Sequence, residues 1–114
     1  MIAQKLSINE IIFKLWEDGV RLSIPEMFKY IRNDFGVDEY DFHARASVGR
    51  LVTFLLAKEL LHMNKEMSFC KVELLKTLQK VDPDVSDHDV RFAMRKLIDE
   101  HLVEFDQCRT IKAK

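Results

Sequence analysis

The sequence predicts a mainly α protein with short β-hairpins, which belongs to the α+β fold class. Three observations lead to this prediction. Serine-capped segments with apolar residues at helical spacing recur along the chain. Short apolar segments separated by turn residues follow some of these helices. The pattern also occurs twice, with related positions forty-two residues apart, as Val48 and Val90 are. With 114 residues, the chain fits one compact domain or two very small units that share a core.

The first two helices begin at capping boxes of the form S-x-x-E, in residues 7–10 and 23–26. Apolar residues up to Trp16 follow helical spacing on one face of the first helix, which Gly19 ends. The second helix ends at Gly36. Between them, "VRLS" in residues 20–23 is a candidate for a short strand.

A third, longer helix is predicted from Phe42 or Ser47 to Glu59. The segment "LLHMNKEMSF" in residues 60–69 is predicted to form a strand, a turn and a second strand.

The second half repeats this scheme. Val72, Leu75 and Leu78 define a helix that breaks at Pro83. Ser86 caps the next helix, which runs to about Glu100. "LVEF" and "RTIKA" are predicted to be two strands joined by a turn at residues 106–108.

A shift of forty-two residues aligns the apolar positions of the third helix and the segment after it with the last helix and strand. "EMFKYI" also aligns with "ELLKTL" at a shift of forty-seven. We therefore predict two units, residues 1–69 and an abbreviated unit in residues 70–114 packed on the first. The aligned residues are Val48, Leu51, Val52, Leu55, Leu56, Leu60, Leu61 and Met63 with Val90, Ala93, Met94, Leu97, Ile98, Leu102, Val103 and Phe105.

The order of elements resembles the winged helix-turn-helix family. Residues 85–105, "VSDHDVRFAMRKLIDEHLVEF", are similar to the recognition helix and first wing strand of GntR- and MarR-type regulators. In that pattern a capped helix of the form S-x-x-x-V-R-x-A-x-x-x-L precedes a Leu-Val strand. The chain departs from the family in its longer "KVDPDVS" turn and in His101, where bacterial members usually have glycine. The resemblance implies tandem winged-helix units and a DNA-binding transcriptional regulator that acts as a dimer.

The last helix has an apolar face that includes Val90 and Leu97, and an opposite face rich in cations. Arginine reaches guanine edges with two hydrogen bonds, and cations neutralise phosphates. The resemblance places the wing near the tail "DQCRTIKAK". The competing interpretation of the cationic face is a solvated helix surface. The candidate DNA-binding residues are His88, Arg91, Phe92, Arg95, Lys96, Arg109 and Lys112.

The corresponding face of the third helix is mostly small or apolar. A helix that is apolar on nearly all sides is usually buried, so we expect it to support both units. A dimer interface is the competing explanation. The residues of this face are Ala46, Gly49, Arg50, Thr53, Phe54 and Ala57.

The formal net charge of −1 is unusual for a nucleic-acid binder and favours an alternative function, a winged-helix adaptor or inhibitor that binds a protein. Its partner surface would combine an acidic stretch with Phe92, since an exposed phenylalanine often marks an interface. The acidic residues are Asp34, Asp38, Glu39 and Asp41.

No nucleophile–base motif, glycine-rich phosphate loop or four-ligand zinc spacing is present, so the sequence predicts no enzyme, no cofactor and no metal. Cys70 and Cys108 form no C-x-x-C pair, which favours reduced thiols and a cytoplasmic location. The longest apolar stretch, residues 51–57, is too short to span a membrane, and no signal peptide is expected.

Overall fold

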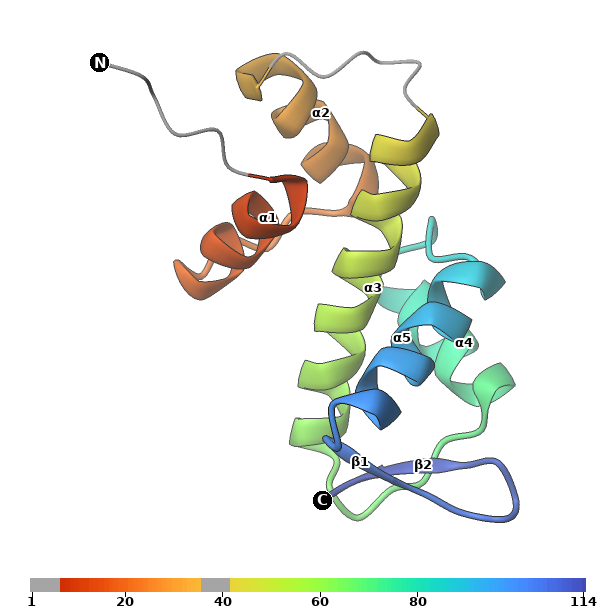
Figure 1. Ribbon diagram of the computed structural model, residues 1–114. Coiled ribbons are helices and arrows are strands. Elements are labelled where there is room, and N and C mark those ends of the chain that lie inside the picture. The colour runs from red at the N-terminus through yellow and green to blue at the C-terminus, as the bar shows by residue number, and fades with distance from the viewer. Residues whose placement is uncertain (1–6, 36–41) are drawn as a thin grey trace.

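The computed structural model describes residues 7–35 and 42–114. This part of the chain is mainly helical with one short antiparallel sheet, which confirms the α+β class (Figure 1). The elements are α1 (Ile8–Glu17), α2 (Ile24–Phe35), α3 (Phe42–Met63), α4 (Lys71–Val81), α5 (Asp87–Asp99), β1 (Val103–Phe105) and β2 (Ile111–Ala113).

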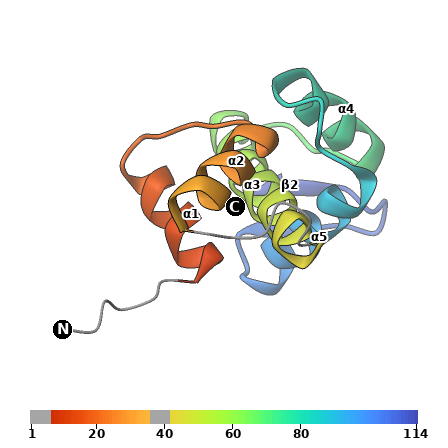
Figure 2. The same cartoon turned by 90° about the horizontal axis from the view of Figure 1, so that it is seen from above.

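The helix α3 is the central element of the fold. Seen from above, α1 and α2 lie on one side of it, and α4 and α5 lie on the other (Figure 2). The buried apolar side chains from all these elements form one continuous core. The prediction that this helix supports both parts of the chain is therefore confirmed.

The most extensive helix–helix packing is between α5 and α3. Gly49, Thr53 and Ala57 follow one another at intervals of four residues, and all three are buried. A Cβ atom at Gly49 would lie 3.1 Å from the carboxylate of Asp89 on α5. Small residues on α3 thus allow the backbones of the two helices to approach closely. Most of the face that was open to interpretation as a dimer interface is therefore buried within the chain, whereas Arg50 at its edge is exposed.

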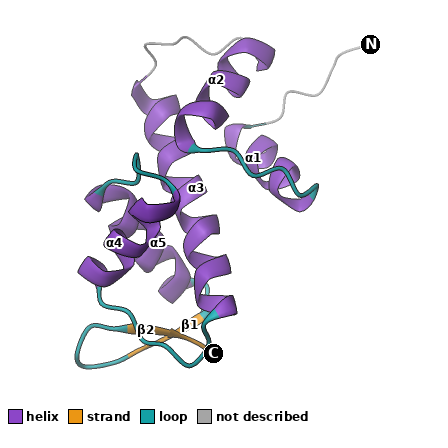
Figure 3. Cartoon of the chain, turned by 180° about the vertical axis from the view of Figure 1, so that it is seen from behind, coloured by secondary structure: helices purple, strands orange, loops and turns teal. Residues whose placement is uncertain are grey.

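The strands β1 and β2 pair with Val103 opposite Ala113 and Phe105 opposite Ile111 (Figure 3). An isolated β-bridge between Phe69 and Ile111 attaches the segment before α4 to this hairpin. The N–H of each residue donates to the carbonyl oxygen of the other, with nitrogen–oxygen distances of 2.9 Å from Phe69 and 2.8 Å from Ile111. The carboxylate of Asp106 closes the turn because it accepts hydrogen bonds from the backbone of Cys108 and from Thr110.

A buried carboxylate ties the N-terminal helices to the second half. Asp82, which is 2% exposed, accepts hydrogen bonds from the backbone N–H of Ile24 at 2.7 Å and of Asp84 at 3.1 Å. The N–H of Ile24 belongs to the first turn of α2, where a negative charge is favoured by the helix dipole.

The structure confirms the helices that begin at Ser7, Ser23 and Ser86, and the hairpin formed by "LVEF" and "RTIKA". Gly19 ends the first helix with a φ of +83°, a conformation that glycine adopts without strain.

Two strand predictions are wrong. The hairpin expected in residues 60–69 does not form, because Leu60 and Leu61 continue α3 and Leu61 packs into the core. Periodicity alone does not distinguish a short apolar run in a buried helix from a strand. Residues 20–23 form a connection rather than a strand, and the N–H of Val20 bonds the carbonyl of Leu15 at the end of α1. The described residues of the first half thus contain no counterpart of β1 and β2, and the division into units of residues 1–69 and 70–114 stays a prediction.

Candidate functional site

The helix α5 is fixed by its N-terminal cap and by its inner face. Ser86 accepts a hydrogen bond from the N–H of Asp89, and the Asp89 carboxylate accepts one from the N–H of Ser86. Val90, Ala93 and Leu97 are at most 1% exposed and pack into the core. The opposite face is therefore held outward in a defined orientation.

Each of the three cations on this outward face is paired with a carboxylate four residues away. Arg91 contacts Asp87 at 2.8 Å, and Arg95 contacts Asp99 at 3.4 Å. Lys96 pairs with Glu100 at 2.9 Å. The Arg91 and Arg95 side chains are 62% and 80% exposed, so water and salt screen these pairs and each adds little to stability. The sequence suggests a cationic surface, and the structure gives one on which opposite charges nearly cancel.

Asp87 also connects α5 to α4. The ammonium of Lys71 lies 2.9 Å from its carboxylate. The hydrogen bond from Lys71 is the main cause that lowers the pKa of Asp87, and the nearby charges of Arg91, Lys71 and His88 act in the same direction.

Phe92 lies on the same face and is 39% exposed. The guanidinium of Arg50 on α3 lies 5.7 Å from the centre of its ring, within the range of a cation–π contact. The ammonium of Lys96 similarly lies 5.1 Å from the ring centre of Phe54, which is buried between α3 and α5.

The remaining predicted DNA-binding residues lie at the two ends of this region. His88 is exposed near the start of α5. Arg109 is exposed in the hairpin turn with a φ of +60°, and Lys112 is half-buried on β2 opposite Glu104. The acidic residues of the alternative site, Asp34, Asp38, Glu39 and Asp41, have side chains outside the described residues.

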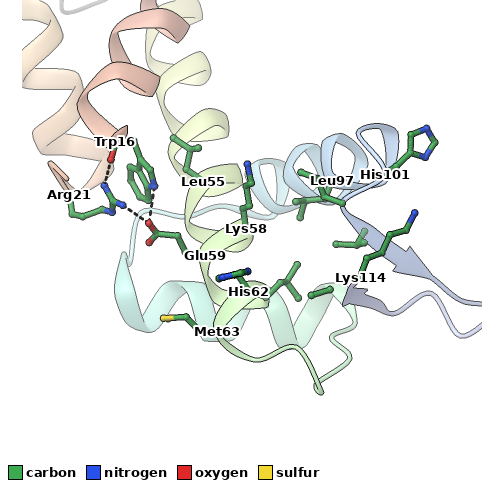
Figure 4. A pocket seen from close by; sticks show the side chains of 14 residues that line it. Trp16, Arg21, Leu55, Lys58, Glu59, His62, Met63, Leu97, His101 and Lys114 are labelled. Atoms are coloured by element: carbon green, nitrogen blue, oxygen red, sulfur yellow. Dashed lines mark hydrogen bonds and ion pairs between the residues drawn. The ribbon is translucent and has the colours of Figure 1, made fainter. Parts of the chain in front are cut away.

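A groove that the sequence did not predict lies on another part of the surface (Figure 4). Its volume is about 920 Å³. The second half of α3 forms its floor, the end of α1 with Arg21 forms one wall, and the end of α5 with β1 and β2 forms the other. The apolar lining comes from Trp16, Leu55, Leu61, Met63, Leu97, Leu102, Val103 and Ala113.

One wall of this groove is held by a polar cluster. The carboxylate of Glu59 accepts hydrogen bonds from the indole N–H of Trp16, at 2.9 Å, and from the guanidinium of Arg21. Arg21 also stacks on Trp16, with its guanidinium 3.9 Å from the ring centre. The four-residue spacing of Lys58 and His62 was the available sequence signal, since it places two basic side chains on one face of α3.

Among the described residues, no group of three or more His, Cys, Asp or Glu side chains is arranged to hold a metal ion. Cys70 and Cys108 are free thiols. None of the helices in residues 7–35 and 42–114 combines the length and apolar composition needed to cross a membrane.

Comparisons with family models, curated proteins and solved structures found no match for this chain.

Proposed function

We propose that the chain is a winged-helix protein that binds double-stranded DNA, with α5 as its recognition helix and the β1–β2 hairpin as its wing. One observation carries this proposal: the order of elements from α3 to β2. A helix, the strand residue Phe69, two helices and two strands follow in sequence, and Phe69 pairs with Ile111 on the hairpin. This order is typical of the winged helix-turn-helix family, to which residues 85–105 are similar.

In this proposal α3 acts as the first helix of a single winged unit, and α1 and α2 are additions packed on its far side. Arg91 and Arg95 lie one helical turn apart on the exposed face, so both can enter the same groove of DNA. Their ion pairs are weak enough for phosphates to replace the carboxylates. Because the charges on this face nearly cancel, we expect modest affinity with a strong dependence on salt.

The test is fluorescence polarisation of a labelled mixed-sequence duplex over a series of salt concentrations. Arg91→Ala with Arg95→Ala should weaken binding and reduce the slope of log affinity against log salt by about one unit for each phosphate that these arginines neutralise. Lys76→Ala with Lys80→Ala on α4 changes the net charge equally and is the matched control. If the wild type binds no duplex at low salt, or if both double variants reduce the slope equally, the proposal fails.

Removing a carboxylate should have the opposite effect. Asp99→Asn frees Arg95 and removes a charge that repels phosphate, so this variant should bind the duplex more tightly than the wild type. An unchanged affinity would place DNA away from the end of α5.

A protein-interaction module is the second candidate, and Phe92 is the observation that favours it. An exposed aromatic ring with Arg50 over it, within a face of balanced charge, has the composition of an interface. The simplest partner is a second copy of the chain. Sedimentation over a concentration series tests this: Phe92→Ala should shift a dimer toward monomer, and a wild type that stays monomeric removes the homodimer.

A further inference from the structure

The groove beside α3 differs from the outward face of α5 in whether its basic side chains are already paired with carboxylates. Its carboxylate, Glu59, is already neutralised by Arg21 and bonded to Trp16. Four further basic residues line the groove, and none of their side chains has an ion-pair or hydrogen-bond partner among the described residues. They are Lys58, His62, His101 and Lys114.

The groove therefore combines an apolar lining with two lysines, Lys58 and Lys114, that lack an ion-pair partner among the described residues, although the chain as a whole has a formal charge of −1. On α5, in contrast, an incoming anion must displace a carboxylate from each cation of the outward face. An anion that enters the groove meets no such competitor at Lys58 or Lys114, so its charge-assisted hydrogen bonds are not offset by broken ion pairs.

We infer that this groove binds a small anionic amphiphile, a carboxylate carried on an aliphatic or aromatic body. Its volume of about 920 Å³ falls in the range typical of small-molecule sites, which are mostly apolar with a few polar groups that fix orientation. Lys58 on the floor and Lys114 at the end of β2 bind the carboxylate, and the apolar body covers Leu102 and Ala113, which are only half-buried. This site is independent of DNA binding by α5.

Trp16 provides a direct reporter, because it is the single tryptophan of the chain and lines the groove. Titration with decanoate, below its aggregation concentration, should change the tryptophan fluorescence in a saturable way. Decan-1-ol has the same hydrocarbon chain without the charge and should bind about tenfold or more weakly. Equal binding of the acid and the alcohol would contradict the role of the cations.

Matched double variants locate the anion. Lys58→Gln with Lys114→Gln should reduce decanoate affinity about tenfold or more, whereas Lys76→Gln with Lys80→Gln on α4 should leave it unchanged. Equal reductions in the two variants would show attraction by net charge alone and would overturn the inference.

A third variant tests the groove itself. Ala113→Leu places a larger side chain in the wall of the groove and should reduce decanoate binding, with circular dichroism used to verify the fold. The inference is also overturned if the wild type does not bind decanoate. This holds even if the groove binds an acidic helical peptide instead.

Discussion

The helices α3 and α5 carry apolar residues at matching positions, forty-two residues apart, but their second faces differ. Gly49, Thr53 and Phe54 on α3 correspond to Arg91, Arg95 and Lys96 on α5. The α3 residues are buried under α5. The corresponding α5 residues all pair with carboxylates of their own helix; Arg91 and Arg95 are exposed, whereas Lys96 is half-buried with its ammonium over the Phe54 ring.

This difference shows how one apolar pattern serves two positions in a fold. A helix with a single apolar face packs at the periphery, and a helix with a second face of small and apolar residues becomes the central support. The exposed second face of the peripheral helix is then available for binding. Paired substitutions at corresponding positions test this contrast.

The largest effect is expected at Phe54, which is 1% exposed. Phe54→Asp places an unpaired charge in the core and should cost about 3–5 kcal/mol, a large part of the stability of a small domain. Phe92→Asp makes the same change on the exposed face of α5 and should cost less than about 1 kcal/mol. Thermal unfolding followed by circular dichroism measures both. Similar melting temperatures for the two variants would show that the second face of α3 is open.

The next effect concerns the close approach of the helices at Gly49. Gly49→Leu forces a side chain against the Asp89 carboxylate, which also caps α5, and should cost about 1–3 kcal/mol. Arg91→Leu, at the corresponding position of α5, should change stability by no more than about 0.5 kcal/mol. Chemical denaturation of the two variants gives the comparison, and a tolerated Gly49→Leu would mean that the helices do not pack closely at this point.

A smaller effect of opposite sign is expected at Thr53. Its hydroxyl is buried and has no hydrogen-bond partner within residues 7–35 and 42–114, so Thr53→Val removes a desolvated polar group at little change in shape. We expect stabilisation of about 1 kcal/mol, seen as a melting temperature raised by a few degrees. The control is Thr77→Val on α4, where the hydroxyl donates to the carbonyl of Glu73 at 2.8 Å and no gain is expected.

The smallest effect is the pH dependence of the surface pairs on α5. The pKa of Asp87 is lowered, chiefly by the hydrogen bond from Lys71, so its stabilising contribution is present above the ordinary aspartate range. This contribution disappears as the pH falls through the lowered value. Lys71→Gln should raise the pKa of Asp87 toward its usual value, as measured by NMR titration of the side chain. The change in stability should be slight because the pair is exposed and screened by salt.

Much of the secondary structure could be predicted because its causes are local. The serine caps at residues 7, 23 and 86 satisfy the first N–H groups of their own helices. The β1–β2 hairpin was also predicted, since its strands and turn are neighbours in sequence. The length of α3 was not, because the apolar run of Leu60 and Leu61 suits either a helix or a strand until its packing is known.

For the candidate sites, the sequence by itself determined which side chains are available: three cations on one face of α5, and small or apolar residues on the second face of α3. It also indicated the central burial of α3, because a helix that is apolar on nearly all sides must be covered to keep both faces from water. The tertiary structure decided the electrostatic state of those cations, since ion pairing depends on side-chain positions and on Lys71 from another helix. It alone created the groove, whose walls come from α1, α3, α5 and the hairpin, segments far apart in sequence that only packing on α3 brings together.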